Sequence, residues 1–548
     1  MMTRFALLCA SAFALSLSGC DRCGRTQTAS ADPLATTTSA LAAAATVECT
    51  APGIPISPTL YGVAFADADA DLGASAHRWG GNTTSRYNWR IGAWNTGAGW
   101  FWENIKVDSH EVFLAKAAAK GGRAAITVPI MGWVAKDSVS SSFPTASAGP
   151  QEKTDEYRPG AGNGVGPDGK SLLEAKSPTL TSVQSTPADV GQWVAKIRAA
   201  EKASGKRVVY EYILDNEPGL WSSSHRDVHP APVSYDELLE RTIAYATAIR
   251  KADPEALIAG PSSFGWWEYF YSAVDHDKGF TLKPDRRAHG DEPLIAWYLR
   301  KLAEHQKRTG VRLLDVLDVH FYPQADGVQF PDGKGGDGDG KTDDATNALR
   351  YRVTRSLWDR SYKDESWIND NVYLIPRMQE LIAQNYPGLG LQIGEYNFGA
   401  EQHPAGGVAL AEGLGRMAQG GVSHAYYWTA PAKGTPAYSA FRAYANYDGK
   451  GGRFAGNIVP SSSSPGTSLY ASRSADGKKW VLIALNFSAA ATKPMQISLK
   501  GCGTLGTAKS YVSKGDQGGL WEAPLALPAG DVLTASLPPT SVSVIELR

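Results

Sequence analysis

The middle of the chain alternates between short apolar segments and longer amphipathic ones. The short segments are rich in β-branched and aromatic residues and end at Gly, Pro or Asn, which is typical of strands. The longer segments space their apolar residues three or four positions apart, which is typical of helices. We predict strands at residues 56–64, 76–82, 124–131, 208–214, 256–260, 317–323, 391–399 and 422–428. We predict helices between them at residues 108–120, 188–202, 233–252, 291–309, 372–384 and 403–419.

Strands that are separated by helical segments in this way predict a (β/α)₈ barrel, in which parallel strands close on themselves. Beyond about residue 440 the pattern changes to short alternating strands, such as 480–487 and 541–547, with turns of Gly, Pro and Ser. That pattern predicts a β-sandwich. The predicted fold is therefore α/β, with a TIM barrel at residues 48–440 and a C-terminal β-sandwich at residues 441–548.

The first residues of the chain have the composition of an export signal followed by a linker. An apolar run at residues 5–17 is too short to span a bilayer and fits a secretory signal. It ends in Leu17-Ser18-Gly19-Cys20, which resembles the cleavage box of bacterial lipoproteins. We therefore expect residues 1–20 to be a signal peptide and Cys20 to carry a lipid; an ordinary signal that is cut further along is the alternative. Residues 21–47 are rich in Ser, Thr and Ala, which predicts a linker.

The five cysteines also favour export. Cys9 lies in the predicted signal, and Cys20 and Cys23 lie in the tail. Cys49 and Cys502 remain, one near each end of the folded part. We predict a disulfide between them that ties the first residues of the barrel domain to the sandwich; two unpaired thiols are the alternative.

Composition and charge narrow the choice of partners. A net charge of −1 gives no reason to expect a nucleic-acid partner or a basic membrane-binding face, so membrane contact would come only through the lipid. Outside the signal, no segment is long and apolar enough for a transmembrane helix. The 16 Trp and 23 Tyr often lie beside Gly, Asn or Pro, where they either fill the core or stack on sugar rings. We expect a monomer that binds a polysaccharide.

Two glutamates lie at the ends of predicted strands. Glu217 follows the strand at 208–214, and Glu395 lies within the segment at 391–399. Pro218 has no N–H and disfavours a helical conformation at Glu217, so we expect Glu217 to be extended at the tip of its strand. The carboxyl ends of barrel strands form the catalytic face. Two carboxylates there could flank one bond, as glycosidases require.

Polar and aromatic residues near other predicted strand ends extend this candidate site. A Gly pair between Arg78 and Asn82 would let a ligand approach the backbone, although Arg78 could instead be an ion-pair partner in the barrel mouth. His320 and Tyr322 are two positions apart and hence on one face, although His320 could be an ordinary barrel histidine. The aromatic rings would stack on successive sugars in an open cleft. We predict substrate contacts from Arg78, Asn82, Trp102, Asn216, Trp221, His320, Tyr322, Trp358, Tyr396 and Trp428.

Together these motifs resemble glycoside hydrolase family 44, whose members are retaining endo-β-1,4-glucanases and xyloglucanases. An isolated Asn-Glu-Pro occurs in many barrel hydrolases, but the ordered set from about residue 56 onward is specific. The resemblance implies that Glu217 is the acid/base and Glu395 the nucleophile, that a sandwich accompanies the barrel, and that the chemistry needs no cofactor. The motifs that carry the resemblance lie at residues 78–82, 214–218 with Trp221, 313–320, 356–359, 366–368, 395–396 and 446–450.

On this hypothesis Glu395 attacks the anomeric carbon while Glu217 protonates the leaving oxygen, and water then resolves the glycosyl-enzyme. The carboxyl groups should be about 5–5.5 Å apart, whereas about 9 Å would mean inversion. We expect internal cleavage of β-1,4-glucan backbones, either cellulose-type glucan or xyloglucan. Two alternatives remain open: another barrel endo-glycosidase such as a mannanase or xylanase, or a non-catalytic, lipid-anchored glycan-binding protein.

A Gly-rich segment carries alternating aspartates at Asp337, Asp339 and Asp343. Carboxylate oxygens suit a hard cation, and some members of the family that the chain resembles are reported to bind calcium. The segment lacks a bidentate Glu at the offset of a complete calcium loop. Structural calcium at these aspartates is therefore one interpretation, and a solvated turn is the other.

Overall fold

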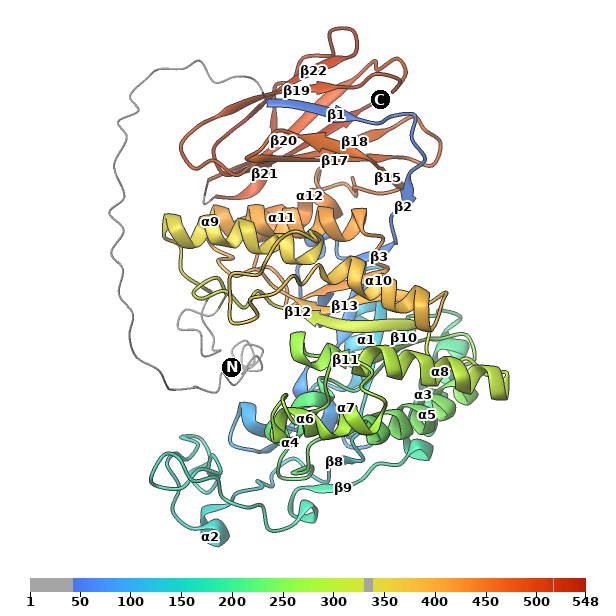
Figure 1. Cartoon of the computed structure of the whole chain (residues 1–548), viewed down its shortest axis with the longest axis vertical. Helices are drawn as coiled ribbons and strands as arrows, with labels where there is room; N and C mark the ends of the chain where they lie inside the picture. Colours follow the sequence, from blue (N-terminus) through green and yellow to red (C-terminus); the bar gives the residue numbers. More distant parts are fainter. Residues whose placement is uncertain (1–42, 330–338, 516) are drawn as a thin grey trace.

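A computed structural model describes residues 43–329, 339–515 and 517–548 of the chain (Figure 1). Parallel strands close into a barrel in the order in which they follow each other along the chain, and β14 pairs with β3 to complete it. The predicted (β/α)₈ barrel is confirmed. Its strands are β3 (Thr59–Ala64), β4 (Ala76–Trp79), β7 (Arg123–Val128), β10 (Val209–Leu214), β11 (Leu257–Ser263), β12 (Val316–Phe321), β13 (Gly390–Tyr396) and β14 (His424–Tyr427).

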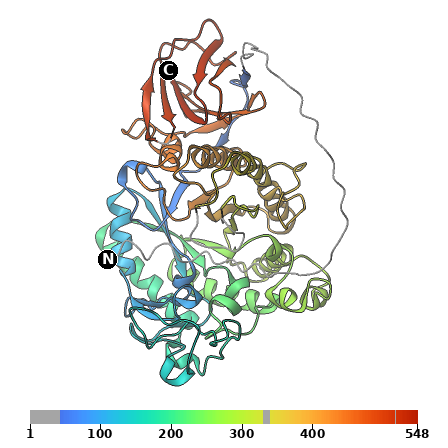
Figure 2. The same cartoon turned by 90° about the vertical axis from the view of Figure 1, so that its left-hand side faces the viewer.

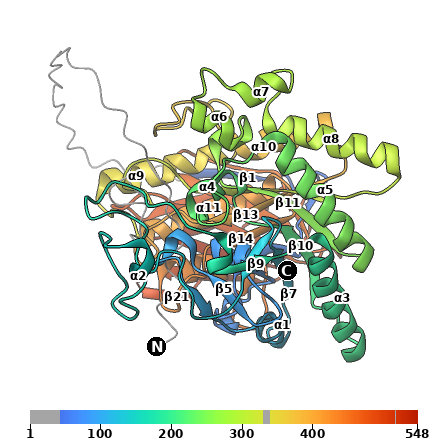
Figure 3. The same ribbon diagram turned by 90° about the horizontal axis from the view of Figure 1, so that it is seen from below.

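Helices surround the barrel, and Figure 3 shows α3, α5 and α8 beside one another along one side of it. Helix α3 begins with a capping box between Thr186 and Asp189 and ends at Gly205, which is in the left-handed conformation. The helices that follow or precede barrel strands are α1 (His110–Ala119), α3 (Pro187–Ser204), α5 (Tyr235–Ala252), α8 (Leu294–Thr309), α9 (Asp344–Val353), α10 (Leu374–Asn385), α11 (Pro404–Gln419) and α12 (Pro436–Ala445).

The interior of the barrel changes from apolar to charged along the direction of its strands. Ala76 and Val316 belong to an apolar cluster inside the barrel, together with Ile213 and Tyr426. Arg78 lies two positions after Ala76 on β4. Asp318 and His320 lie two and four positions after Val316, on the same face of β12. Every residue of β12 is buried, as expected for a parallel strand with both faces covered. The charged groups therefore gather at the carboxyl ends of the strands.

The C-terminal part forms two packed sheets, which confirms the predicted β-sandwich. One sheet has the order β16 (Ser461–Ser463), β1 (Ala43–Val47), β19 (Lys493–Ser498) and β22 (Val532–Leu537). The other has the order β2 (Ile54–Pro55), β15 (Asn457–Val459), β17 (Thr467–Arg473), β18 (Trp480–Asn486), β23 (Ser541–Leu547), β20 (Ala508–Lys514) and β21 (Gln517–Ala523). The two strands from the start of the described chain thus belong to the sandwich.

Cys49 and Cys502 form the predicted disulfide, with Cα atoms 4.9 Å apart. The bridge joins the segment after β1 to the loop after β19. Helices α11 and α12 lie between the barrel and the sandwich (Figure 2). At Gly415 of α11 a Cβ atom would lie 2.4 Å from the ring of Tyr470 in β17, so only glycine allows this close approach. Within the described ranges no helix has both the length and the apolar composition needed to cross a bilayer.

Candidate active site

The turn after β10 presents Glu217 in an unusual backbone conformation. Strand β10 ends at Leu214, and Glu217 has φ 46° and ψ 60°, in the left-handed region. Our prediction of an extended Glu217 was therefore wrong. The carboxylate of Asp215 accepts hydrogen bonds from the N–H groups of Ile130 (2.6 Å) and Met131 (3.0 Å), and these tertiary contacts determine the course of the turn. Positive φ at a non-glycine residue costs about 1–3 kcal/mol and is concentrated at functional sites.

The carboxylate of Glu395, near the end of β13, is held on both oxygens. Arg78 Nη1 donates to Oε1 at 2.6 Å, and the hydroxyl of Tyr322 donates to Oε2 at 2.8 Å. Arg78 Nη2 donates to Asn216 Oδ1 at 2.8 Å. The guanidinium thus joins the strand tip that carries Glu395 to the turn that carries Glu217. Arg78 is fully buried and Glu395 is 4% exposed.

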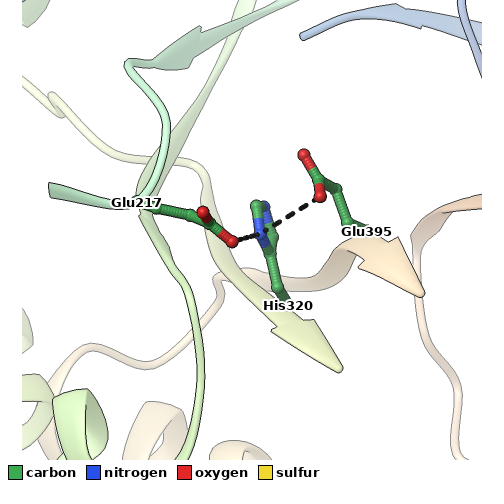
Figure 4. Close-up of side chains that lie close together, drawn as sticks. All are labelled: Glu217, His320 and Glu395. Carbon is green, nitrogen blue, oxygen red and sulfur yellow. Dashed lines mark hydrogen bonds and ion pairs between the residues drawn. The ribbon is translucent and has the colours of Figure 1, made fainter. Parts of the chain in front are cut away.

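His320 lies between the two glutamates (Figure 4). Its Nδ1 is 2.9 Å from Glu217 Oε1 and 3.8 Å from Glu395 Oε2. Its Nε2 contacts Ser262 Oγ at 3.1 Å. One oxygen of each glutamate and one ring nitrogen of His320 all lie within 4.8 Å of one another. This close approach of the two carboxylates is compatible with the roughly 5–5.5 Å between the carboxyl groups of retaining glycosidases.

The surroundings push the pKa values of the two glutamates in opposite directions. Burial raises the pKa of Glu217, and the negative charge of Glu395 adds to this effect. Burial also acts on Glu395, but the charges of His320 and Arg78 outweigh it and lower the pKa of Glu395. The neighbouring carboxylates raise the pKa of His320 against the effect of its burial. These opposite shifts favour a protonated Glu217 and an ionised Glu395.

Several residues predicted to contact substrate do gather around this pair. Asn82 Oδ1 accepts a hydrogen bond from Asn216 Nδ2 at 2.9 Å, so both amides lie beside Arg78. Trp428, just beyond the end of β14, is half-buried. Its ring lies against Gly81, where a Cβ atom would come within 2.5 Å of Cη2. Arg78, Asn82, Asn216, His320, Tyr322 and Trp428 are thus placed around the two glutamates or next to their partners.

Burial contradicts the predicted stacking role of Trp102 and Trp221 and the predicted substrate contact of Tyr396. Trp221 and Tyr396 are fully buried and Trp102 is 3% exposed, so none has a free face for a sugar ring. Trp221 Nε1 donates to the carbonyl of Asn216 at 3.2 Å, and Trp102 Nε1 donates to the carbonyl of Asn163 at 3.0 Å. These rings support the loops from within.

Trp358, another predicted substrate contact, lies where the barrel meets the sandwich. The guanidinium of Arg416 on α11 lies 3.9 Å from the centre of its ring, and the same guanidinium lies 5.5 Å from the ring of Tyr470 in the sandwich. Trp358 therefore packs on the side of the barrel that meets the sandwich. Its neighbours Arg416 and Tyr470 explain its position in the fold without a sugar.

A pocket that the sequence did not reveal opens beside His320 and Tyr322. Phe264 and Trp266 line it from the loop after β11, and Trp367 lines it from the segment before α10. Trp367 is 61% exposed, which is unusual for so large an apolar ring. The signal in the sequence was the pair of aromatic clusters beside Gly265 and Ser366, which carry no fixed spacing to the glutamates.

Metal binding is not favoured by the charges at the centre of the site. Among the described residues, Glu217, His320 and Glu395 form a group with ligand spacing. The Arg78 guanidinium against Glu395 and the raised pKa of His320 both oppose a cation there.

The predicted calcium segment is only partly described. Asp337 lies outside the described residues, Asp339 accepts hydrogen bonds from the N–H groups of Glu401 (2.7 Å) and Gln402 (3.3 Å), and Asp343 caps α9. The two described carboxylates thus serve separate backbone donors. Calcium binding at this segment stays a prediction.

A closed parallel barrel that brings together two carboxylates at the carboxyl ends of β10 and β13, with pKa values shifted in opposite directions, defines the class of barrel glycoside hydrolases that use a carboxylate pair. The profile of glycoside hydrolase family 44 matches residues 93–325. A bifunctional glucanase-xylanase from a metagenome library has a crystal structure that aligns with a TM-score of 0.86 and 34% identity, over 92% of this chain and 99% of that one. The chain belongs to glycoside hydrolase family 44, as its motifs indicated.

Two further relatives match the chain at lower sequence identity. A Paenibacillus polymyxa xyloglucanase of family 44, solved with xyloglucan, aligns with a TM-score of 0.76 and 26% identity over 92% of this chain and 99% of that chain. A β-mannanase/endoglucanase A of Caldicellulosiruptor saccharolyticus is 31% identical over 458 residues, which are 76% of this chain. The present chain spans only 32% of the length of that curated relative.

Proposed function

We propose that the protein is a retaining, endo-acting hydrolase of β-1,4-glucan backbones. The observation that carries this proposal is the arrangement of Glu217 and Glu395, which have carboxylate oxygens within 4.8 Å of each other and pKa values shifted in opposite directions. Family membership supports the same reaction class.

In the first step the ionised Glu395 attacks the anomeric carbon, and Glu217 gives its proton to the leaving oxygen. Arg78 and Tyr322 hold the two oxygens of Glu395 in place for this attack. In the second step Glu217, now a carboxylate, takes a proton from water, which attacks the covalent glycosyl-enzyme. His320 Nδ1 lies 2.9 Å from Glu217 Oε1 and can stabilise the charge that Glu217 acquires. Asn216 is the candidate partner for the 2-hydroxyl of the sugar, an interaction that strengthens in the transition state.

Exchange of each glutamate for glutamine tests the proposal. Glu217→Gln and Glu395→Gln keep the size of the side chain but remove the proton donor and the nucleophile, so each should lower kcat on soluble glucan by at least about 100-fold. Azide should restore turnover of an activated aryl glycoside by Glu217→Gln and yield a glycosyl azide with retained configuration. Thermal unfolding of both variants verifies that they are folded. Near-normal hydrolysis by a folded variant would refute the role of that glutamate.

The preferred backbone is proposed to be β-1,4-glucan, either cellulose-type or decorated as in xyloglucan. The names of the relatives support this choice, and they also justify including xylan and mannan in a substrate panel. Release of reducing ends should be highest on glucan or xyloglucan, with a rapid fall in viscosity that reports internal cleavage. Higher kcat/KM on mannan or xylan would identify the alternative endo-glycosidase. Absence of turnover on every polymer would favour a glycan-binding protein.

We also propose that the protein is exported and anchored by a lipid on Cys20. The segment Leu17–Cys20 supports the anchor, and the disulfide between Cys49 and Cys502 supports an oxidising compartment. Labelled palmitate fed to the producing cells should appear in the protein and be absent from Cys20→Ala. Label in both forms, or in neither, would contradict the anchor.

Two smaller expectations rest on the sequence alone. Calorimetry of chelated protein with calcium tests the aspartate segment at 337–343, and the absence of heat would remove that hypothesis. Sedimentation equilibrium tests the expectation of a monomer.

A further inference from the structure

The carboxylate of Glu268 joins two loops at the catalytic end of the barrel. Glu268 lies in a short 3₁₀ helix, Trp266–Tyr269, after β11 and is 2% exposed. Its Oε1 accepts a hydrogen bond from the N–H of Gly219 at 2.8 Å. Its Oε2 accepts from Ser263 Oγ at 3.0 Å and from the N–H of Phe264 at 2.8 Å. A buried side chain from the loop after β11 thus binds the loop after β10.

The loop after β10 is the one that carries Glu217, and its conformation needs support. Glu217 has positive φ, and its N–H donates to the carbonyl of Ser262 at 3.0 Å. Gly219, two residues later, is pressed so closely against Glu268 that a Cβ atom would lie 2.8 Å from the carboxyl carbon. The turn Glu217–Gly219 is therefore fastened at both ends, once through the backbone to the end of β11 and once through Glu268 to the loop after β11.

We propose that Glu268 is a positioning residue for the acid/base carboxyl, which keeps Glu217 directed at the leaving oxygen. The assignment rests on the proposed retaining hydrolase function. Glu268 itself does not touch the reacting atoms. It acts by fixing the backbone of Glu217, whose strained conformation would relax if the Gly219 contact were lost.

Electrostatics agree with this close relation between the two glutamates. Burial raises the pKa of Glu268 to about 7, and the negative charge of Glu217 also raises it, against the lowering effect of the three hydrogen-bond donors. The two carboxyls therefore influence one another, although they face different parts of the loop.

The dependence of kcat/KM on the leaving group tests whether Glu268 positions the acid Glu217 or has only a general structural role. A poor leaving group needs the proton of Glu217, whereas 2,4-dinitrophenolate leaves without protonation. The value of kcat/KM for aryl β-cello-oligosaccharides reports the first chemical step for both kinds of leaving group. Loss of acid positioning should therefore slow the unactivated phenyl substrate and the polymer but spare the dinitrophenyl substrate.

Glu268→Gln is the principal variant. The amide has the shape of the carboxyl, but its NH₂ group must face either the N–H of Gly219 or that of Phe264, so one of these donors loses its acceptor. Ser263→Ala is a milder second variant that removes one hydrogen bond to Glu268 and leaves the carboxylate in place.

Glu201→Gln is the matched control. Glu201 lies on α3 and binds the backbone where β10 begins, whereas Glu268 binds the loop after β10. Glu201 is also buried, and its Oε1 accepts from the N–H groups of Val208 and Val209, both at 2.7 Å. Its exchange likewise removes a carboxylate that binds two backbone donors, but remote from Glu217. Its leaving-group dependence should equal that of the wild type.

The expected result is a fall in kcat/KM of about tenfold or more for Glu268→Gln on the polymer and the phenyl substrate, with less than about a twofold fall on the dinitrophenyl substrate. Ser263→Ala should change the same ratio in the same direction by a smaller factor, which keeps the test valid if Glu268→Gln does not fold. Equal losses on all substrates, or no loss, would overturn the role of Glu268 and leave the proposed function intact. Absence of activity in the wild type would instead refute the proposed function, and the role of Glu268 with it.

Discussion

Arg78 and Tyr322 donate to different oxygens of Glu395, and both contacts favour its ionised form. The same carboxylate is almost completely buried, which by itself would favour the protonated form. The low pKa of Glu395 therefore depends on a small number of directed hydrogen bonds and on the charges of Arg78 and His320. Removal of one donor should be visible in the pH dependence of the reaction.

We predict that Tyr322→Phe shifts the acidic limb of the kcat/KM profile to higher pH. Glu395 must be ionised to attack, and loss of the phenolic donor raises its pKa, so activity is lost at a higher pH than in the wild type. A hydrogen bond to a charged group contributes about 1.5–3 kcal/mol, so kcat/KM at the optimum should also fall by about 10- to 100-fold. The measurement is kcat/KM on a soluble glucan across the pH range.

Tyr245→Phe provides the control for this prediction. Tyr245 lies on α5, and its hydroxyl donates to the carbonyl of Ser185 at 2.6 Å rather than to either glutamate. The control loses an equivalent buried hydroxyl and should keep the pH profile of the wild type. An unshifted acidic limb in Tyr322→Phe would show that its hydroxyl does not determine the pKa of Glu395.

A glycine in the loop after β4, Gly81, makes room for the ring of Trp428. Gly81 has φ 91° and ψ 169°, a combination that is almost exclusive to glycine, and the ring of Trp428 occupies the space of a missing Cβ. Phe65 lies against the same ring, with centroids 5.7 Å apart. Of the glycine pair noted in the sequence, Gly81 thus makes room for Trp428, and Gly80 makes room for the guanidinium of Arg78.

Gly81→Ala should displace Trp428 and weaken binding of the polymer. The added methyl would lie 2.5 Å from Cη2 of the indole, so either the ring or the loop must move. We expect KM for glucan to rise by about tenfold and stability to fall by about 1–3 kcal/mol, measured by steady-state kinetics and chemical unfolding.

Gly121→Ala is the control that separates the effect of backbone strain in Gly81→Ala from the effect of displacing Trp428. Gly121 also has positive φ, but nothing lies within 4 Å of the added methyl. This variant should lose stability through backbone strain alone and keep the KM of the wild type. A wild-type KM in Gly81→Ala would mean that Trp428 does not contribute to binding.

The first described residues hold the sandwich together although they precede the barrel in the chain. Strand β1 pairs with β16 and β19 in one sheet, and β2 pairs with β15 in the other. Between them, the disulfide from Cys49 closes a loop of 453 positions to Cys502. The disulfide and both strands thus hold the segment that leads into the barrel within the sandwich, and α11 packs between the barrel and the sandwich.

We predict that the double variant Cys49→Ser with Cys502→Ser unfolds at a lower temperature than the wild type. A disulfide that closes a long loop restricts the unfolded chain and typically contributes about 2–5 kcal/mol. Activity below the transition should be unchanged, because the bridge lies in the sandwich and the glutamates lie at the end of the barrel. Thermal unfolding with and without reductant provides the measurement.

Reductant should lower the midpoint of the wild type and leave that of the double variant unchanged. Equal midpoints for the two proteins under oxidising conditions would show that the bridge adds no stability.

The sequence by itself predicted the fold class and the disulfide, and it pointed to Glu217 and Glu395 as the candidate catalytic pair. These features depend on local patterns: apolar periodicity distinguishes strands from helices, and the residues around Glu217 and Glu395 place each at a strand end. Cysteine pairing followed from elimination, since only Cys49 and Cys502 remained in the folded part.

Only the tertiary structure decided which aromatic residues are free to meet a sugar. Trp221 and Trp367 both lie beside small polar residues in the sequence, yet one is fully buried and the other 61% exposed. The left-handed backbone of Glu217 and the contact between Glu268 and Gly219 likewise depend on partners from other loops. Burial and hydrogen bonding at these positions arise from residues far apart in the chain, and no local pattern encodes them.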